Sequence, residues 1–393
     1  MTLLVPDRVF DGERMHADWK VLVRDDKIME AGPSMDRPAG QIDTVFLPGI
    51  TLMPGLIEGH AHILLHPYNE TSWNDQVLRE SLAERVLRAS NHLLVSLRNG
   101  FTTLRDLGTE GAEYADVGIK QALNKNVITG PDLLVAGKAI VATGSYGPKG
   151  FSFKPPQGAE EADASNLIQV VRNQIGQGVD FIKIYADYRW GPFGQAMPTF
   201  SLEEIRMVVE TAKSSGRVVV AHASTKEGMR RSVLGGVSTI EHGDDGDLEI
   251  FKLMKERRVA YCPTLAAGEA ILEYGGWKKN TDPLPDRIRK KRQSFREALA
   301  AGVDILFGGD VGVFPHGDNA RELILMQEYG MTSEAVLRSA TAGNADAFGF
   351  KNRGRIRAGY LADLVAIRGN PMENLNDIYR VDFVMKNGRR VEK

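Results

Sequence analysis

The sequence predicts an α/β protein: a (β/α)8 barrel, or TIM barrel, with a small β-sandwich domain built from both ends of the chain. Two observations carry this prediction. Between about residue 56 and residue 345, short apolar runs alternate with helical stretches, which is typical of a barrel of parallel strands. Both ends instead contain short strand-like runs separated by turn residues, which favour antiparallel pairing.

The chain ends have the pattern of β-hairpins. Near the N-terminus, Val21–Arg24 and Lys27–Glu30 are strand-like runs separated by two aspartates. Near the C-terminus, Ala362–Ile367 is strand-like and Asn387–Gly388 is a dipeptide that favours a tight hairpin turn. Because the C-terminal part is too short to fold alone, we expect residues 1–55 and 355–393 to form one discontinuous β-sandwich domain and residues 56–354 to form the barrel.

Eight apolar runs are the predicted barrel strands. The stretches between them have helical apolar spacing, as at Leu202, Ile205 and Val208. Gly178 and Gly236 fall just before a strand, where a glycine commonly ends a helix. The runs are Leu56–Gly59, Thr102–Asp106, Asp132–Ala136, Asp180–Ile184, Val218–Ala221, Thr239–Glu241, Val259–Cys262 and Asp304–Phe307.

Composition excludes several function classes. The 393 residues are 42% hydrophobic and 25% charged, with a net charge of −2, so neither nucleic acid nor an anionic membrane is an expected partner. The basic run Arg287–Arg292 is flanked by acids, and we interpret it as a solvated helix face. One cysteine, Cys262, allows no internal disulfide. No leader or membrane-spanning pattern is found, so we expect a cytoplasmic protein.

Five polar residues stand at the carboxyl ends of predicted strands, where a barrel places its active site. His60 and His62 follow the first strand and point to the same side of extended chain. His222 ends the fifth strand, His242 ends the sixth, and Asp310 follows the eighth. Imidazole and carboxylate groups converging on one barrel mouth predict a metal site.

Lys183 lies inside an apolar run, Val179–Tyr185, which contains the fourth predicted barrel strand. A charged lysine is costly there unless it is paired or modified. It either extends to solvent or pairs with an aspartate, or its neutral amine has reacted with CO2. The resulting carbamate is an anion that can bridge two metal ions, as a carboxylate does.

Together these residues resemble the amidohydrolase superfamily. The matched motifs are Pro54–His62, the fourth-strand lysine, the histidines of the fifth and sixth strands and the eighth-strand aspartate. Within the superfamily, Thr239–Gly243 and Asn344–Gly349 resemble the imidazolonepropionase-like and prolidase-like group. That group includes carboxypeptidases acting on Xaa-Pro or Xaa-Arg dipeptides and ochratoxin-type N-acyl amino acid hydrolases.

The resemblance implies a metallohydrolase with two divalent ions, usually Zn²⁺, bridged by Lys183 as N6-carboxylysine. A hydroxide bridging both ions would attack the substrate amide, and Asp310 would carry its proton to the leaving amine. Members commonly form homo-oligomers, so we expect one here. The implied ligands are His60, His62, Asp310 and the carbamate for one ion, and the carbamate, His222 and His242 for the other.

The sequence departs from the dipeptidases of this group at two places. Their glycine-rich segment after the third strand often carries a histidine, but Ala142–Pro148 has none, and Tyr146 is our candidate replacement. Ser224 stands where they often have a tyrosine. Arg189 is a candidate clamp for a substrate carboxylate and Tyr188 for stacking on an acyl group, although both could belong to an ordinary exposed loop. The candidate substrate-binding residues are Ser145, Tyr146, Tyr188, Arg189 and His316.

Three functions remain in view. The first is hydrolysis of the amide bond of an N-acyl amino acid or small peptide. The second is a single-metal deaminase or cyclic amide or amidine hydrolase of the same superfamily, but His222–Thr225 lacks the glutamate that such deaminases carry at the fifth strand. The third is a non-catalytic scaffold, which has no reason to keep all six ligands. We therefore predict the amide hydrolase.

Overall fold

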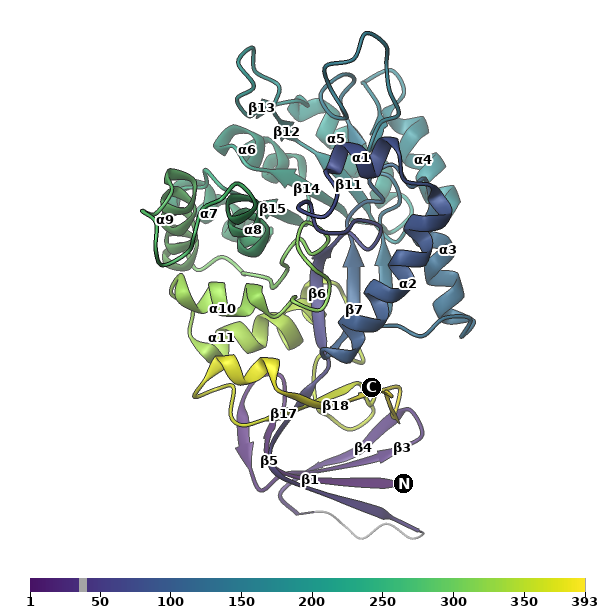
Figure 1. Ribbon diagram of the computed structural model, residues 1–393, viewed down its shortest axis with the longest axis vertical. Helices are drawn as coiled ribbons and strands as arrows, with labels where there is room; N and C mark the ends of the chain where they lie inside the picture. Colours follow the sequence, from purple (N-terminus) through teal and green to yellow (C-terminus); the bar gives the residue numbers. More distant parts are fainter. Residues whose placement is uncertain (35–40, 393) are drawn as a thin grey trace.

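The computed structural model describes residues 1–34 and 41–392, so positions 35–40 and 393 of the predicted end domain lie outside the described residues. The architecture is α/β (Figure 1). A mixed sheet at one end of the molecule carries strands from both chain termini, and sheets of parallel strands surrounded by helices fill the rest.

Both chain ends pair in one eight-stranded mixed sheet. Leu52 on β5 is paired with Ala366 on β17, so the first and last parts of the chain are directly hydrogen-bonded. An isolated antiparallel bridge also links Lys27, at the start of β4, to Leu361, shortly before β17. Its strands are β1 (Thr2–Phe10), β2 (Met15–Ala17), β3 (Lys20–Arg24), β4 (Lys27–Gly32), β5 (Asp43–Pro54), β17 (Leu364–Arg368), β18 (Val381–Lys386) and β19 (Arg389–Arg390).

The turn predicted at Asn387–Gly388 connects β18 to β19. Both residues have positive φ, 49° and 73°, as the central residues of a type I′ hairpin turn require. The end sheet is attached to the rest of the molecule by polar contacts as well as by chain connection. Lys386 donates to Asp132 at 2.9 Å, and Arg353 donates to the same carboxylate oxygen at 2.5 Å.

Seven of the eight predicted barrel runs are parallel strands. The remaining run, Asp304–Phe307, appears only as a bridge between Ile305 and Tyr261. The strands lie in two sheets, β6-β7-β8 and β10-β9-β11-β14-β15-β16. Their bounds are β6 (Leu56–Ala61), β7 (Phe101–Asp106), β8 (Asp132–Val135), β9 (Ile140–Val141), β10 (Glu160–Glu161), β11 (Ile182–Tyr185), β14 (Val219–Ala223), β15 (Thr239–His242) and β16 (Ala260–Cys262).

Backbone contacts connect these two parallel sheets at both edges. At one edge the Asp180 N–H donates to the Val135 carbonyl at 2.8 Å. At the other, the Gly59 N–H donates to the Phe307 carbonyl at 3.1 Å, and Ala61 bridges to Val311. The carboxyl ends of the parallel strands are therefore held around a common space. A separate short hairpin, β12 (Asp187–Tyr188) and β13 (Met197–Pro198), follows β11.

Helices alternate with the parallel strands and cover their outer side (Figure 1). The predicted helix around Ile205 is α5, where Ser201 and Glu204 form a capping box and Ile205, Val208 and Ala212 are buried. Within the described parts of the chain, none of the helices combines the length and apolar character needed to cross a membrane. The helices are α1 (Trp73–Leu78), α2 (Leu82–Arg98), α3 (Ala115–Asn124), α4 (Leu167–Gln177), α5 (Leu202–Lys213), α6 (Lys226–Gly235), α7 (Leu248–Arg257), α8 (Leu265–Tyr274), α9 (Asp286–Ala301), α10 (Arg321–Glu328), α11 (Ser333–Arg338), the π-helix η1 (Ser339–Gly343), α12 (Asn344–Ala347) and the 3-10 helix η2 (Leu375–Tyr379).

Asn344, at the start of α12, connects the first and last parts of the strand arrangement. Its side-chain amide is fully buried and donates to the Ile57 carbonyl at 2.8 Å and to the Phe307 carbonyl at 2.7 Å. The Asn344–Gly349 motif found in the sequence therefore has a structural basis in its first residue. Asn344 fastens β6 to the segment that leads to Asp310.

We expect Asn344→Leu, which keeps the branched shape of the side chain but has no amide, to lower the free energy of unfolding by about 1–3 kcal/mol, because two buried carbonyl contacts lose their donor. Urea unfolding followed by fluorescence measures the change. Asn376→Leu makes the same substitution at an exposed position and serves as the control. Equal stability of the two variants would contradict the anchoring role of Asn344.

Candidate metal centre

The structure brings the six predicted metal ligands to one place. His60 lies on β6, Lys183 on β11, His222 on β14 and His242 on β15. Parallel pairing sets Lys183 beside Val220 and Tyr185 beside His222, so neighbouring strands deliver their side chains to the same edge. Among the described residues, donor atoms of His60, His242 and Asp310 all lie within 4.8 Å of one another.

Distances between the side chains fit one compact cluster. The Oδ1 atom of Asp310 lies 3.5 Å from His60 Nε2 and 3.4 Å from His62 Nε2. The rings of His222 and His242 have centroids 4.3 Å apart, and those of His60 and His242 are 5.2 Å apart. His60 Nε2 and Asp310 Oδ1 are buried atoms without a hydrogen-bond partner. Buried polar atoms normally have partners, so this pair indicates room for a cation.

Three of the four histidines have their Nδ1 atoms engaged by protein groups. His60 Nδ1 contacts Glu241 Oε2 at 3.0 Å, and His62 Nδ1 contacts the Gly108 carbonyl at 2.8 Å. His242 Nδ1 contacts the Thr264 hydroxyl at 2.8 Å. A partner on one ring nitrogen fixes the tautomer and aims the other nitrogen, so each of these histidines presents Nε2 as a ligand atom.

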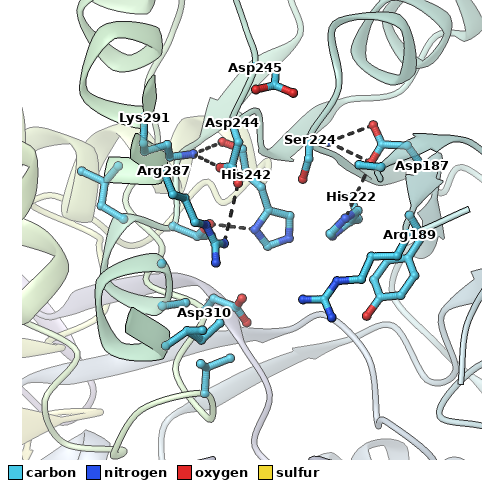
Figure 2. A pocket seen from close by; sticks show the side chains of 18 of the residues that line it. Asp187, Arg189, His222, Ser224, His242, Asp244, Asp245, Arg287, Lys291 and Asp310 are labelled. Carbon is cyan, nitrogen blue, oxygen red and sulfur yellow. Dashed lines mark hydrogen bonds and ion pairs between the residues drawn. The ribbon is translucent and has the colours of Figure 1, made fainter. Parts of the chain in front are cut away.

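The fourth histidine, His222, is placed by different contacts. Its Nε2 lies 3.7 Å from Asp187 Oδ1, which is longer than a hydrogen bond (Figure 2). Asp187 is itself fixed, because it accepts the N–H groups of Ser224 at 2.9 Å and Thr225 at 2.7 Å. The His222 ring also stacks on Tyr185, with centroids 4.6 Å apart.

Electrostatics in the cluster favour neutral imidazoles. Burial lowers the pKa of His222 to about 3 and lowers the pKa of His60 and His242 well below the ordinary histidine value. Lys183 and the neighbouring histidines add to the effect through charge repulsion. Neutral imidazole is the form that binds metal ions, so the site is prepared for ligation at neutral pH.

Lys183 is almost fully buried at the base of this cluster. Burial also lowers the pKa of its amine, which increases the neutral fraction that can react with CO2. Among the described residues its amine makes no ion pair, so the aspartate partner considered from the sequence is not found. The ring centroid of Tyr185 lies 5.5 Å from its Nζ.

Two of the candidate ligands occupy backbone conformations that are rare for residues with side chains. His242 has φ of 75° and Asp310 has φ of 63°. Left-handed backbone at such residues costs energy and is typical of functional sites held by their surroundings. In this protein it turns both side chains toward the cluster at the point where each strand ends.

Glu241, directly before His242, is a functional residue that the sequence analysis missed. Its fully buried carboxylate accepts from Arg105 Nη2 at 2.8 Å and from the Thr239 hydroxyl, and it contacts His60 Nδ1. Arg105 also donates to the Gly59 carbonyl at 2.7 Å. The carboxylate therefore connects three strands beneath the cluster and orients His60. An acid inside a strand run next to a candidate ligand was the available signal.

Glu58 holds the opposite side of the cluster in the same way. Its Oε1 accepts the N–H groups of His60 and Gly309, both at 3.0 Å, and its Oε2 accepts from Asn319 at 2.9 Å. Burial raises the pKa of Glu58 to about 7. The residue joins β6 to the segment carrying Asp310, so the two parts of the cluster are positioned relative to each other.

A pocket of about 540 Å³ opens above the cluster, within the usual size range for small-molecule sites. His62, His222, His242 and Asp310 line its base, while His60 and Lys183 lie buried beneath them. Tyrosines form one wall, where the ring of Tyr146 packs 4.7 Å from those of both Tyr185 and Tyr188. The wall-lining tyrosines are Tyr68, Tyr146, Tyr185 and Tyr188.

Three of the five predicted substrate contacts line the pocket: Tyr146, Tyr188 and Arg189. The hydroxyl of Tyr146 already donates to Glu110 at 2.5 Å, so it takes part in a wall network. Glu110, which the sequence analysis missed, also accepts from Tyr185 and Trp73, both at 3.0 Å. This carboxylate keeps the tyrosine wall in place.

The other two predicted contacts are corrected by the structure. Ser145 is fully buried, and its hydroxyl donates to the Ala142 carbonyl at 2.7 Å, because the turn after β9 folds its side chain inward. His316 is buried against α2, where its ring stacks on His92 at 4.2 Å and Nε2 contacts the Leu65 carbonyl at 3.2 Å. Neither residue lines the pocket, so both leave the set of candidate substrate contacts.

The basic run on α9 is a second correction. Lys291 is buried and donates to the Asp244 carboxylate at 2.7 Å and to the His242 carbonyl, while Arg287 and Lys290 line the pocket. The run was expected to be a solvated helix face. One side of α9 instead packs beside the end of β15, which places three of its cations at the site.

Comparison with known proteins agrees with this geometry. The model of the Amidohydrolase family matches residues 51–391. The chain belongs to the amidohydrolase family. Ochratoxinase from Aspergillus niger is 29% identical to this amidohydrolase, with 95% of this chain and 81% of the relative covered. The superfamily resemblance found in the sequence is thereby confirmed.

Two further relatives place this amidohydrolase among the groups named from its motifs. A crystal structure of a Xaa-Pro dipeptidase with bound methionine in the active site has a TM-score of 0.87 and 30% identity, with 100% of each chain covered. An imidazolonepropionase from Deinococcus deserti is 23% identical, with 91% of this chain and 87% of the relative covered. Family members generally use metal ions, as the donor cluster of this amidohydrolase would allow.

We expect Glu241→Gln to weaken metal binding by about 10- to 100-fold, because an amide N–H facing His60 Nδ1 favours the wrong tautomer of that ring. The measurement is metal retained by the purified amidohydrolase against increasing chelator. Glu249→Gln changes an exposed glutamate on α7 and should leave retention unaltered. If the two variants hold metal equally well, Glu241 does not orient a ligand.

Proposed function

We propose that this amidohydrolase cleaves the amide bond of an N-acyl amino acid or small peptide, next to a carboxylate-bearing residue, with two divalent metal ions. The observation that carries the proposal is the cluster of four imidazoles, one buried amine and one carboxylate beneath a pocket. In this proposal residues 56–354 form a complete (β/α)8 barrel whose mouth is the pocket, and residues 1–55 and 355–393 form the separate end domain.

The donor set fits two divalent ions. Nitrogen and carboxylate ligands suit zinc, which is our proposed metal, although manganese, cobalt and iron accept the same groups. The unpartnered His60 Nε2 and Asp310 Oδ1 atoms lie 3.5 Å apart, as expected for two ligands of one cation. The proposed ligands are His60, His62 and Asp310 for one ion, His222 and His242 for the other, and Lys183 as N6-carboxylysine between them.

A metal pair held there would lower the pKa of a water molecule and polarise the substrate carbonyl. The protein residues supply the remaining chemistry. Asp310 accepts the proton of the attacking water, whose oxygen bonds to the carbonyl carbon, and returns that proton to the nitrogen as the C–N bond breaks. Without a bound cation, burial raises the pKa of Asp310 to about 6.

The pocket walls suggest how the substrate lies. The tyrosine wall offers an apolar and aromatic surface for the acyl part, since Tyr146, Tyr185 and Tyr188 pack against one another there. Arg189 stands at the rim beside this wall. The relatives with ochratoxinase and Xaa-Pro dipeptidase names support an amide substrate for this chain.

Metal content per chain is the first test of this proposal. Wild-type protein produced with zinc and bicarbonate should contain about two ions, and Lys183→Ala about one or none, because the bridging ligand is removed. Lys226→Ala, an exposed lysine on α6, is the matched control. One ion in every variant would contradict the binuclear site and favour single-metal chemistry.

Asp310→Asn tests the proton carrier. We expect kcat for an N-acyl amino acid to fall by about 10²- to 10⁴-fold, because an amide cannot accept the proton of the attacking water. Metal content is measured in the same sample, so that loss of a ligand is separated from loss of proton transfer. Unchanged kcat with full metal occupancy would exclude this role for Asp310.

A further inference from the structure

Two guanidinium groups enter the pocket from different elements. Arg189 lies on the segment between β12 and β13, and Arg287 lies in the first turn of α9. Figure 2 shows both side chains extending from opposite sides toward the space over Asp310. They belong to segments almost a hundred residues apart, yet they face the same part of the pocket.

Neither guanidinium has its N–H donors fully paired with described groups of the protein. Within the described chain, the Arg189 guanidinium makes no hydrogen bond or ion pair. Arg287 has a single ion pair, with Asp244 Oδ2 at 3.7 Å, which is longer than a hydrogen bond. Each group therefore keeps free N–H donors directed into the pocket, and an arginine fork matches the two oxygens of a carboxylate.

The surroundings of Arg287 hold the start of α9 in place without neutralising the guanidinium, whose side chain is 46% exposed. Asp244 accepts from the buried Lys291 at 2.7 Å, so the negative charge near Arg287 is already shared with another cation. The Lys291 charge also lowers the pKa of Asp244, with that of Arg287 contributing. Because α9 is fixed to the end of β15 through Lys291, the first turn of the helix is held at the pocket rim.

Among the described residues, no acid that lines the pocket apart from Asp244 makes an ion pair with either arginine. Asp286 is paired with Arg289 at 2.5 Å. Asp187 is occupied by the backbone N–H groups of Ser224 and Thr225, and Glu110 by its three aromatic donors. The rim region between Arg189 and Arg287 is therefore available to an anion.

We infer that Arg287, together with Arg189, binds the carboxylate of the substrate's leaving amino acid and makes this amidohydrolase selective for substrates with a free carboxylate. The inference deepens the proposed function and rests on it. It also accounts for the two sequence departures, because Ser224 is too short to reach a substrate as a tyrosine would and Ala142–Pro148 carries no histidine. The anion is held here by arginines from other segments.

The test compares two ligands that differ only in the anionic group: N-acetyl-L-methionine and N-acetyl-L-methioninamide. Calorimetric titration of the zinc-loaded protein gives their dissociation constants, and hydrolysis of both is followed in parallel. Wild type should bind the acid at least about tenfold more tightly than the amide, since charged hydrogen bonds to a carboxylate contribute on this scale. Arg287→Gln should reduce that preference by about 10-fold or more while changing amide binding little.

Arg289→Gln is the matched control. It removes the same charge from the same turn of α9, but Arg289 pairs with Asp286 and does not line the pocket. It should keep the preference for the acid. Metal content and thermal unfolding of both variants confirm that each is folded and loaded.

The outcomes distinguish carboxylate binding by Arg287, which we call the anchor, from the proposed hydrolysis reaction. If wild type binds acid and amide equally, binds neither, or if Arg287→Gln keeps the full preference, the anchor is refuted. If the preference depends on Arg287 but neither compound nor any other N-acyl amino acid is hydrolysed, the anchor stands and the proposed reaction fails. Loss of preference in Arg289→Gln as well would mean that overall charge, and not a contact from Arg287, attracts the acid, which also refutes the anchor.

Discussion

The arrangement of the site depends on the contacts that the buried carboxylate of Glu241 makes with neighbouring strands. The carboxylate accepts from Arg105 on β7 and from Thr239 on its own strand, and it orients His60 on β6. Removing one partner of such a buried pair costs about 3–5 kcal/mol, because the other charge is left without compensation. Arg105 is further enclosed by the ring of Phe348, whose centroid lies 4.2 Å from its guanidinium carbon. The position of the His60 ligand is thus determined by packing and charge pairing across three strands.

Buried carboxylates of this kind restrict the relative positions of the strands. Glu58 adds a second buried carboxylate, shared between the His60 and Gly309 N–H groups and Asn319. Each carboxylate is satisfied only when β6, β15 and the segment after Ile305 stand in one relative position, since any shift leaves a buried acceptor unpaired. The left-handed backbone at His242 and Asp310 can be maintained because these contacts fix both sides of the cluster. The cost of the strained backbone is offset by the network around it.

Strand periodicity and ligand chemistry made the cluster predictable from the sequence. An apolar run ending in a histidine fixes both the strand and the place of the side chain, so His60, His62, His222 and His242 could be assigned to one mouth. Glu241 was missed because an acid within a strand run has no periodic signal, and its partners come from distant strands. Ser145 and His316 were misplaced because the direction of a side chain in a loop depends on how the loop folds. Lys291 looked like one cation of a solvated run, since nothing local reveals that its amine reaches the His242 carbonyl at the end of β15.

The residues proposed for the reaction and those proposed for substrate selectivity lie on different parts of the fold. The proposed metal ligands are held at strand ends, or by the segment after Ile305, on a rigid polar layer, whereas Arg189 and Arg287 come from a hairpin and a helix start at the rim. Loops at a barrel mouth can change without disturbing the strands beneath, so a carboxylate anchor can move from one segment to another while the chemistry stays in place. In this chain Ser224 stands two residues after His222, where related dipeptidases often have a tyrosine. The Ser224 N–H donates to Asp187, which also lies next to His222. The short serine side chain does not extend to an anion in the pocket as a tyrosine would. In the proposed arrangement, Arg287 on α9 supplies the positive charge that the pocket offers to a substrate carboxylate.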